Sequence, residues 1–319
     1  MNILITGGLG YVGGRLAEHI SARQPACKIL LADLPPKTRP RWSEKYSFLP
    51  FDVLDKSSLA AVFRTGRTDA VIHLAALNDA DCAKNPALAM DVNTKGTYNT
   101  LEAAAAAGVP RFIYFSTFHV YGPAAGDTIS EATPAMPAHP YGITHRAAED
   151  YVNYFRVYKG MKTLIFRMSN SYGCPADKGV NAWTLVFNDL CRQLVTAGNI
   201  TLKSAGLQHR DFITLSDAAE AVRYFLYDIP DGWGDGLYNL GGGASISILD
   251  AARRVEKVYE EKYGKRPGPI QTAPAVPGAP EPKPVNYVID KIRKAGFSPA
   301  GGMDGEIART LELCEEFLK

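Results

Sequence analysis

Short apolar runs alternate with helix-like segments from the first residues onward. Residues 2–6 and 28–33 form apolar runs, and residues 11–24 between them carry helical periodicity, which predicts a β-α-β unit. Further helices are expected over residues 57–65, 93–107 and 141–159, and further strands over residues 70–74, 111–116 and 163–168. Nearly continuous apolar strands separated by helices are typical of a parallel sheet covered on both faces. The pattern predicts an α/β fold with a doubly wound parallel sheet.

The alternation weakens after Gly173, where polar and glycine-rich connections follow. An amphipathic helix is expected over residues 181–194, and residues 267–284 are rich in proline. We therefore expect two domains. The sheet domain consists of residues 1–172 plus about 212–242, and a smaller, loop-rich carboxy-terminal domain consists of about 173–211 plus 243–319.

Charge and cysteine content narrow the class of protein. The 35 basic and 33 acidic residues leave a net charge of +2, which argues against a nucleic-acid or membrane partner. The five cysteines are far apart and never form a Cys-x-x-Cys pair, so we expect reduced thiols and no metal site. The first residues lack a basic region, and no apolar run of about 20 residues follows. A soluble, cytoplasmic protein is expected.

Three glycines lie between the first expected strand and its helix. Gly7, Gly10 and Gly13 are spaced three residues apart. Glycines let the backbone approach a pyrophosphate, and the helix that follows offers free N–H groups to the phosphates. Tight turns also carry glycines for steric reasons, but the position in the first β-α-β unit favours a dinucleotide. The spacing predicts a Rossmann-type nucleotide-binding domain.

Asp33 ends the second expected strand, 20 residues after Gly13. A carboxylate there accepts hydrogen bonds from the adenosine ribose and repels a 2′-phosphate, which favours NAD over NADP. A solvated aspartate at the end of a strand gives the same pattern, and the nearby Lys37, Arg39 and Arg41 leave NADP as a minor alternative.

Two residues after the third apolar run are candidate adenine contacts. These are Asp52 and Val53, although an aspartate that merely forms a turn would look the same.

Six motifs follow one another in the order typical of one enzyme family. They are TGGLGYVGG, HLAA, STFHVYG, PYGITH, RMSNSYG and HRDFITLSD. Over nearly its whole length the chain resembles the extended short-chain dehydrogenase/reductases, which include nucleotide-sugar epimerases and dehydratases. The resemblance implies NAD as cofactor, a nucleotide-diphosphate sugar as substrate, and a carboxy-terminal domain that binds the substrate. It assigns to the cofactor Gly7, Gly10, Tyr11, Val12, Gly13, Leu74, Ala75, Ala76 and Asn93.

The resemblance also assigns the reactive centre to Thr117 and Tyr141. Tyr141 would serve as general base for oxidation and general acid for reduction, so a positive group is needed to lower its pKa. The family has lysine four residues after this tyrosine, and here His145 stands in its place. His145 shares a helix face with Tyr141 and is expected to contact the cofactor ribose, but a neutral imidazole lowers the tyrosine pKa only weakly. Arg146 is a possible substitute for the missing charge.

The residues that follow Thr117 bear on the reaction type. In the related 4,6-dehydratases an Asp-Glu pair follows this threonine and acts as acid and base, whereas Phe118 and His119 occur here. Dehydration by that route is therefore not expected. His119 could act as an acid or base, or could only bind the sugar.

The substrate end contains two residues that match the family. Asn170 and Arg210 correspond to positions that contact the nucleotide diphosphate, and a guanidinium suits such a group. An Asx turn at Asn170 and a structural ion pair at Arg210 are the alternatives. The resemblance further implies a homodimer through the helices expected at residues 93–107 and 141–159.

The leading hypothesis is hydride transfer at a ring carbon, C4, of a nucleotide-diphosphate sugar, by a 4-epimerase or a 4-dehydrogenase/4-keto reductase. Two alternatives stay open. The missing lysine would also suit a catalytically weak NAD-binding regulatory protein, and the scaffold would also suit an oxidoreductase of a small hydroxy or amino acid.

Overall fold

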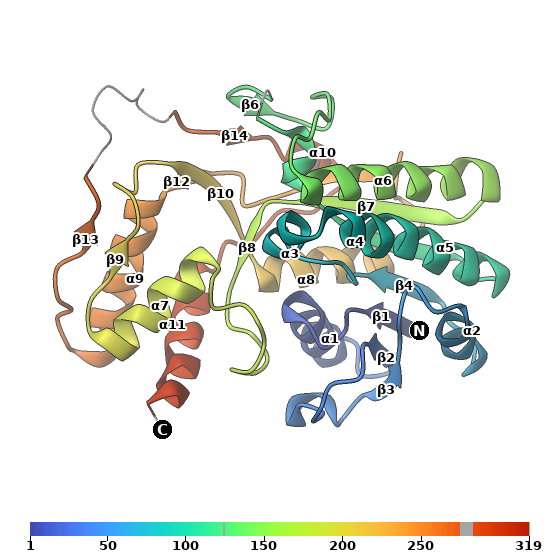
Figure 1. The fold of residues 1–319 in the computed structure, drawn as a ribbon, viewed down its shortest axis with the longest axis horizontal. Helices are drawn as coiled ribbons and strands as arrows, with labels where there is room; N and C mark the ends of the chain where they lie inside the picture. Colours follow the sequence, from blue (N-terminus) through green and yellow to red (C-terminus); the bar gives the residue numbers. More distant parts are fainter. Residues whose placement is uncertain (124, 275–282, 319) are drawn as a thin grey trace.

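A seven-stranded parallel sheet forms the centre of the protein (Figure 1). The computed structural model describes residues 1–123, 125–274 and 283–318. The strand order is β11-β7-β5-β4-β1-β2-β3. The strands are β1 (Asn2–Thr6), β2 (Lys28–Asp33), β3 (Ser47–Pro50), β4 (Ala70–His73), β5 (Arg111–Thr117), β7 (Lys162–Met168) and β11 (Leu237–Leu240). The strand order reverses between β1 and β4, where doubly wound sheets bind their ligands. The expected sheet is confirmed.

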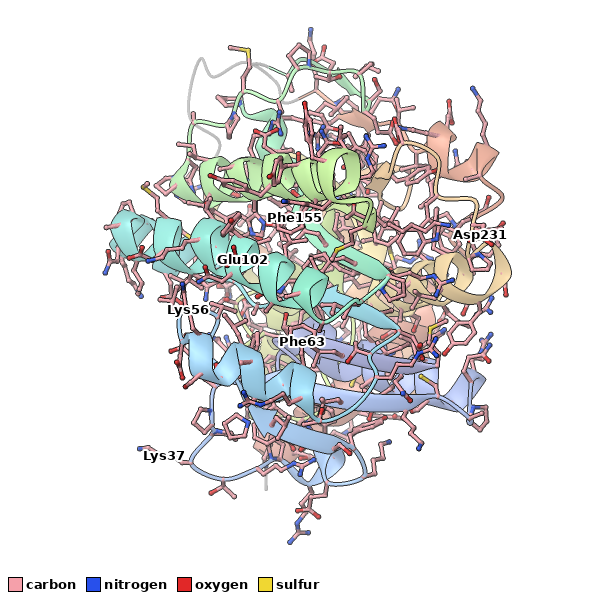
Figure 2. The ribbon with its side chains drawn as sticks, turned by 90° about the vertical axis from the view of Figure 1, so that its right-hand side faces the viewer. Lys37, Lys56, Phe63, Glu102, Phe155 and Asp231 are labelled. Atoms are coloured by element: carbon pink, nitrogen blue, oxygen red, sulfur yellow. The ribbon has the colours of Figure 1, made fainter. Side chains whose placement is uncertain are left out.

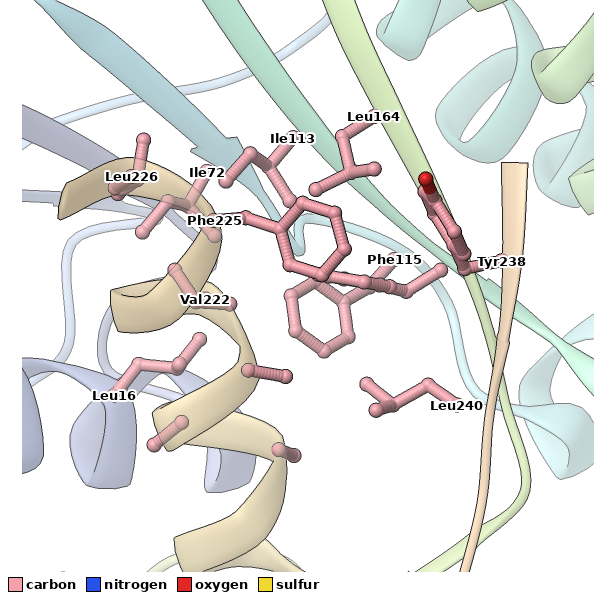
Figure 3. Close-up of a cluster of buried hydrophobic side chains, with 14 of the residues drawn as sticks. Leu16, Ile72, Ile113, Phe115, Leu164, Val222, Phe225, Leu226, Tyr238 and Leu240 are labelled. Atoms are coloured by element: carbon pink, nitrogen blue, oxygen red, sulfur yellow. The ribbon is translucent and has the colours of Figure 1, made fainter. Parts of the chain in front are cut away.

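Helices cover both faces of this sheet. On one face lie α1 (Tyr11–Arg23), α8 (Leu215–Arg223) and the π-helical turn η4 (Tyr224–Asp228). Figure 3 shows Phe225 and its neighbours packed against side chains of β4, β5 and β7, among them Ile72 and Leu164. The other face carries α2 (Lys56–Arg64), α5 (Gly96–Ala106) and α6 (Pro140–Lys159), which lie side by side in Figure 2. Both faces are therefore buried, which explains why the strands are apolar on both sides.

The carboxy-terminal part packs around a third apolar cluster. Helices α7 (Val186–Ala197), α9 (Ile248–Tyr263) and α11 (Met303–Cys314) enclose side chains such as Phe187, Val255 and Leu311. A three-stranded sheet joins this part to the large sheet and consists of β8 (Asn170–Tyr172), β10 (His209–Thr214) and β12 (Ser245–Ser247). Among the described residues, no helix is long and apolar enough to cross a membrane.

The remaining elements are short. They are η1 (Arg41–Ser43), α3 (Asp79–Lys84), α4 (Pro86–Ala89), η2 (Met90–Lys95), η3 (Phe118–Tyr121), β6 (Thr128–Ile129), β9 (Thr201–Leu202), β13 (Gln271–Thr272), β14 (Asn286–Tyr287), α10 (Asp290–Lys294) and η5 (Glu315–Phe317). Part of the proline-rich segment expected at residues 267–284, namely 275–282, lies outside the described residues.

Two expected helices differ in their boundaries from those observed. The helix predicted over residues 93–107 begins inside the π-helical η2 and continues as α5 from Gly96 to Ala106. The segment before it forms α3 and α4, because the side chains of Asn78 and Asn85 cap these helices and Pro86 occupies a first-turn position. The helix predicted over residues 181–194 is α7, which begins at Val186 and ends where Gly198 adopts a left-handed conformation. Caps of this kind interrupt a helix without changing its apolar periodicity.

One carboxy-terminal segment packs against the large sheet. Tyr287, Ile289, Ile292 and Phe297 belong to the same apolar cluster as the side chains of β1 and α8. The division of the chain into two domains stays a prediction. These four residues lie within the range predicted for the second domain, although they pack on the core of the sheet domain.

A buried ion pair connects the first helix to the last. The guanidinium of Arg15 in α1 donates to the Oε1 atom of Glu306 in α11 at 2.8 Å, and both side chains are less than a tenth exposed. Ser216 also donates to this carboxylate, and the N–H of Cys174 donates to Oε2 at 3.2 Å. A buried carboxylate with several donors is stable only while those donors stay in place. Glu306 therefore connects the carboxy-terminal helix α11 to α1, which follows the first strand of the sheet.

Removal of the Glu306 carboxylate should destabilise the protein strongly. We expect Glu306→Ala to lower the free energy of unfolding by about 3 kcal/mol, because Arg15 stays buried with Ser216 as a partner but without a carboxylate. Glu312→Ala, on the same helix, loses only a surface pair with Lys262 and should cost less than about 1 kcal/mol. Denaturant titrations of both variants measure the difference, and equal losses would contradict this role of Glu306.

Candidate active site

The glycines of the turn between β1 and α1 let backbone segments approach one another more closely than a side chain would allow. Gly7 has a φ of +64°, and a Cβ atom there would lie 2.9 Å from the backbone nitrogen of Ala75. A Cβ on Gly13 would lie 2.5 Å from the carbonyl oxygen of Gly7. Gly10 is the residue that precedes α1 and offers no side-chain cap, and the first turn of the helix has no acidic residue. The N–H groups of this turn are therefore suited to an anionic pyrophosphate, as the glycine spacing predicts.

Asp33 lies beside this turn at the end of β2. Its Oδ2 atom accepts the N–H of Leu9 at 2.9 Å, and its Oδ1 atom accepts the N–H of Leu34 at 2.8 Å. Burial raises the pKa of the carboxyl group, whereas these two hydrogen bonds lower it. The carboxylate thus connects the glycine turn to the end of the second strand.

A cavity of about 580 Å³ opens next to the glycine turn. It is lined by Leu9, Gly10, Tyr11, Pro36, Thr38, Arg39, Pro40, Arg41, Asp177, Gly179, Val180 and Asn181. Arg39 is already engaged in this structure, because its guanidinium donates to the carbonyl oxygens of Ser43 and Tyr46 and lies 5.3 Å from the ring of Phe48. Arg39 is one of the three basic residues that made NADP a minor alternative. Because its guanidinium is already engaged, it is poorly placed to bind the 2′-phosphate of NADP.

Tyr11 and Val12 follow the glycine turn at the start of α1. The Tyr11 hydroxyl donates to the carbonyl oxygen of Gly173 at 2.9 Å, which joins the first helix to the carboxy-terminal part. Val12 is partly buried against the core that α1 shares with α8.

Asp52 and Val53 form a turn after β3. The Oδ1 atom of Asp52 accepts the N–H of Leu54 at 2.9 Å, which is the turn-forming alternative considered above. Val53 is 6% exposed and packs against Gly96 of α5. Contact of either residue with adenine stays a prediction.

The loop after β4 is held by hydrogen bonds from both sides. Thr6 Oγ1 accepts the N–H groups of Leu74 and Ala75 at 3.2 and 3.4 Å. Ala76 follows, and the N–H of Leu77 donates to the Oδ1 atom of Asn93 at 2.7 Å.

Asn93 itself is fully buried. Its Nδ2 atom donates to Thr144 of α6 at 3.1 Å, so its side chain joins the loop after β4 to the helix that begins with Tyr141. In this structure Asn93 acts as a positioning residue, and its contact with the cofactor stays a prediction.

The four residues predicted for the reactive centre come together at the ends of β5 and α6. Thr117 ends β5, and its Oγ1 atom accepts the N–H of His119 at 3.2 Å. The ring centroid of Tyr141 lies 5.8 Å from that of His119 and 4.5 Å from that of His145. Gly142 permits this approach, because a Cβ atom there would lie 2.6 Å from the carbonyl oxygen of His119.

Burial dominates the electrostatics of this centre. It raises the pKa of Tyr141 to about 12, with Cys82 and Asp79 adding to the shift and Thr117 opposing it. Burial also lowers the pKa of His145 to about 3, so its imidazole is neutral at pH 7. The same cause lowers the pKa of His119. His145 thus cannot supply the positive charge of the family lysine.

Arg146 is directed elsewhere. Its Nη1 atom lies 2.5 Å from the carboxylate of Asp150 and 3.6 Å from that of Glu149. These carboxylates compensate its charge, so Arg146 does not replace the missing ammonium next to Tyr141.

The sequence analysis missed a set of buried partners behind the reactive centre. The Tyr114 hydroxyl lies 2.6 Å from Nδ1 of His145. Glu149 accepts two hydrogen bonds from the guanidinium of Arg167, at 2.9 and 2.7 Å, and one from Ser116 at 2.6 Å. Tyr141, His145 and Glu149 follow one another at four-residue spacing, which could have indicated that Glu149 shares their helix face. No local pattern identifies its partners Ser116 and Arg167, because these lie on separate strands.

Asn170 and Arg210 line one small cavity. The cavity measures about 30 Å³ and is also lined by Phe118, Ser169, His209, Asp211, Val285 and Tyr287. The Asn170 amide donates to the carbonyl oxygen of Asp211 at 3.0 Å, and Arg210 is exposed. The cavity has room for water but not for a sugar nucleotide, so a nucleotide diphosphate would have to lie across its mouth.

Comparison with known proteins identifies the family. Residues 3–241 match the NAD dependent epimerase/dehydratase family. The chain belongs to this family. Its members are NAD-dependent enzymes that act on nucleotide sugars, which confirms the resemblance, the enzyme class and the cofactor inferred above. The glycine turn and Asp33 fit NAD, because the first turn of α1 has neither a side-chain cap nor an acidic residue, and the Asp33 carboxylate lies beside it.

Individual relatives extend over most of the chain. The dTDP-glucose 4,6-dehydratase of Escherichia coli is 27% identical over 98% of this chain and 92% of its own length. The UDP-glucose 4-epimerase of Streptococcus mutans is 27% identical over 85% of this chain and 87% of its own. The UDP-glucose 4-epimerase of Thermus thermophilus, solved with NAD, is 26% identical, covers 99% of both chains and superposes with a TM-score of 0.81.

The buried histidines should make stability depend on pH. Burial lowers the pKa of His73 and of His145 to about 3, whereas both titrate near 6.5 when unfolded. The unfolded state therefore takes up protons that the folded state does not, and the free energy of unfolding should fall below pH 6.5 by about 1 kcal/mol per pH unit for each histidine. Urea titrations between pH 7.5 and about pH 5 measure this slope. His145→Asn should reduce the slope of the unfolding free energy with pH by the contribution of one histidine. An unchanged slope in that variant would contradict the burial of a neutral His145.

Proposed function

We propose that this enzyme transfers a hydride at C4 of a nucleotide-diphosphate sugar, as a 4-epimerase or as a 4-dehydrogenase/4-keto reductase. The observation that carries the proposal is the grouping of Thr117, His119, Tyr141 and His145 beside the cavity of Asn170 and Arg210. The relatives named above act on UDP-glucose or dTDP-glucose. A binding protein without chemistry would need neither the paired hydroxyls nor the cavity beside them.

In the proposed reaction Tyr141 accepts the proton of the sugar hydroxyl that is oxidised. Thr117 donates a hydrogen bond to the same oxygen, and His119 binds the sugar or exchanges a proton with it. Bound NAD supplies the hydride acceptor and a positive charge near the phenol. In the reverse direction Tyr141 returns its proton to the new hydroxyl oxygen. Because burial raises the Tyr141 pKa to about 12, the phenolate needs stabilising donors around it.

For cofactor binding we propose the glycine turn, Asp33 and the loop after β4. Gly7, Gly10 and Gly13 would hold the pyrophosphate, with Tyr11 and Val12 alongside it at the start of α1. Asp33 would accept hydrogen bonds from the adenosine ribose. The further contacts proposed along the cofactor are Asp52, Val53, Leu74, Ala75, Ala76, Asn93 and His145.

The residue pair after Thr117 favours this reaction over 4,6-dehydration. Phe118 packs its ring 4.3 Å from that of His119, and Phe118 carries no acid or base. The Asp-Glu pair that serves dehydration in the related enzymes is thus replaced by an apolar residue and an imidazole.

Incubation with UDP-, GDP-, CDP- and dTDP-sugars tests the function. We expect one of them to be converted either to an isomer of equal mass without net absorbance at 340 nm, or to a product that differs by two hydrogens with net NADH. The first result assigns a 4-epimerase and the second a dehydrogenase or reductase. Tyr141→Phe is the matched control and should bind NAD without turnover. Absence of both sugar-nucleotide binding and turnover would favour a catalytically weak NAD-binding regulatory protein. Turnover of a small hydroxy or amino acid would favour an oxidoreductase of such acids.

We also infer that the protein forms a homodimer through α5 and α6. The outer face of α6 exposes Tyr151, Tyr154, Val157 and Tyr158, whose exposed fractions lie between 39% and 75%. Tyr98 of α5 continues this surface, with its ring 5.2 Å from that of Tyr151. Apolar side chains at three- and four-residue spacing on two neighbouring helices suit a second copy of the same surface.

Charges on the outer face of α6 should separate the dimer. We expect the double variant Tyr154→Glu, Val157→Glu to have the mass of one chain in light scattering, because four glutamates would face one another in the dimer. Leu318→Glu places a charge on another exposed apolar residue and should leave the mass unchanged. A wild-type protein with the mass of one chain would refute the inference.

A cytoplasmic location and the two-domain division are proposals as well. All five cysteines are free thiols, which suits a reducing compartment. The separate apolar cluster enclosed by α7, α9 and α11 supports a distinct substrate-binding domain.

A further inference from the structure

His145 lies enclosed between two tyrosines. Its Nδ1 atom is 2.6 Å from the hydroxyl of Tyr114, and its ring meets that of Tyr141 edge to face at 4.5 Å. The residue is 3% exposed, and within the described part of the chain its Nε2 atom is buried without a hydrogen-bond partner. Unpaired polar atoms are rare in protein interiors, so this nitrogen calls for a functional explanation.

The hydrogen bond with Tyr114 decides which nitrogen of His145 carries the proton. Tyr114 is 2% exposed, and burial holds its pKa well above the usual value, so the phenol stays protonated. Its short hydrogen bond is the one to Nδ1 of His145 at 2.6 Å, while the nearby Thr97 hydroxyl moderates the rise of its pKa. Because the phenol keeps its proton and an imidazole nitrogen is a good acceptor, the phenol donates to Nδ1, and the proton of the neutral imidazole resides on Nε2.

The tautomer of a second buried histidine, His73, is also fixed by its hydrogen bonds. The Thr97 hydroxyl donates to the carbonyl oxygen of Asn93 at 2.6 Å, so it must accept from Nε2 of His73 at 3.1 Å. The Nδ1 atom of His73 then accepts from Thr6 at 2.8 Å. The His73 ring stacks on Tyr114 with centroids 6.0 Å apart. Tyr114 is thus supported by a group that is itself held in place by hydrogen bonds.

We propose that Tyr114 is a positioning residue that holds His145 as its neutral Nε2–H tautomer, and that this N–H stabilises the Tyr141 phenolate in place of a lysine ammonium. The inference rests on the proposed role of Tyr141 as the base. The negative charge of a phenolate spreads over its ring and its oxygen. An N–H that faces either of them is therefore attractive, whereas the lone pair of the other tautomer would be repelled.

The other ionisable groups around this centre do not supply a positive charge. They are Asp79 and Cys82 of α3, His73 of β4, Tyr114 of β5, His119 of η3 and Glu149 of α6. Asp79 and Cys82 oppose ionisation of Tyr141. Glu149 is paired with Arg167. The Thr117 hydroxyl lowers the pKa of Tyr141, and the ring of His145 lies against the Tyr141 ring with centroids 4.5 Å apart.

Nitrogen-15 NMR of histidine-labelled protein tests the tautomer without any substrate. We expect His145, assigned by loss of its signal in His145→Asn, to show a protonated Nε2 and an unprotonated Nδ1 with and without NAD. Tyr114→Phe should shift His145 towards a mixture of tautomers. His73 serves as internal reference, because its Nε2–H form does not depend on the Tyr114 hydroxyl. A protonated Nδ1 or an imidazolium in the wild type would overturn the proposal.

The pH dependence of turnover tests the consequence for Tyr141. In the pH profile of kcat, Tyr114→Phe should raise the apparent pKa of the general base by about one unit. At pH 7 this corresponds to about a tenfold loss of kcat, with little change in KM. His145→Gln, which keeps an N–H near the Nε2 position, should lose less than His145→Asn, which keeps only the Nδ1 side. An equal loss at every pH would indicate a merely structural role and refute the proposal.

Tyr238→Phe is the matched control. This buried tyrosine of β11 is 4% exposed, and its hydroxyl donates to the carbonyl oxygen of Trp233 at 3.4 Å, away from the reactive centre. Its pH profile should equal that of the wild type. If no sugar nucleotide is turned over, the proposed function fails, and the NMR result still decides whether Tyr114 sets the tautomer.

Discussion

The polar residues on the inner face of α6 must find partners inside the protein, and the reactive centre depends on those partners. His145 and Glu149 are 3% and 2% exposed, so neither can rely on water. Tyr114 of β5 bonds His145, and Arg167 of β7 with Ser116 bonds Glu149. A buried carboxylate without its guanidinium would cost several kcal/mol, so the helix has essentially one stable position on the sheet. That position places Tyr141 next to Thr117 and His119.

The same principle connects the two ends of the chain. Glu306 of α11 accepts hydrogen bonds from Arg15 of α1 and from the backbone of Cys174. Tyr11, which follows the glycine turn, donates to the neighbouring Gly173. The elements next to the proposed pyrophosphate site are thereby bonded directly to the carboxy-terminal part. A cofactor at the glycine turn would therefore lie next to a helix that is hydrogen-bonded to the carboxy-terminal part.

Histidine in place of lysine changes the electrostatics of the centre from charged to neutral. An ammonium favours a phenolate through its charge, whereas a neutral imidazole can offer only the direction of its N–H bond. Burial raises the Tyr141 pKa to about 12 and lowers that of His145 to about 3, and both shifts keep the pair uncharged. A neutral donor works only if its tautomer is controlled, which gives the hydroxyl of Tyr114 a purpose that lysine would not require.

The sequence by itself determined the parallel sheet, the glycine turn, Asp33 and the order of the motifs, because each depends on local periodicity or on short spacing along the chain. It also indicated that Tyr141 and His145 share a helix face. Only the tertiary structure decided that Arg146 is paired with Asp150, that Arg39 is bound to backbone carbonyls, and that Asn93 is buried between a loop and α6. Tyr114 stands in the middle of an apolar strand and has no sequence signal of its own. Its role depends on a contact with a residue 31 positions away, and such contacts are set by the packing of a helix on a sheet rather than by any local pattern.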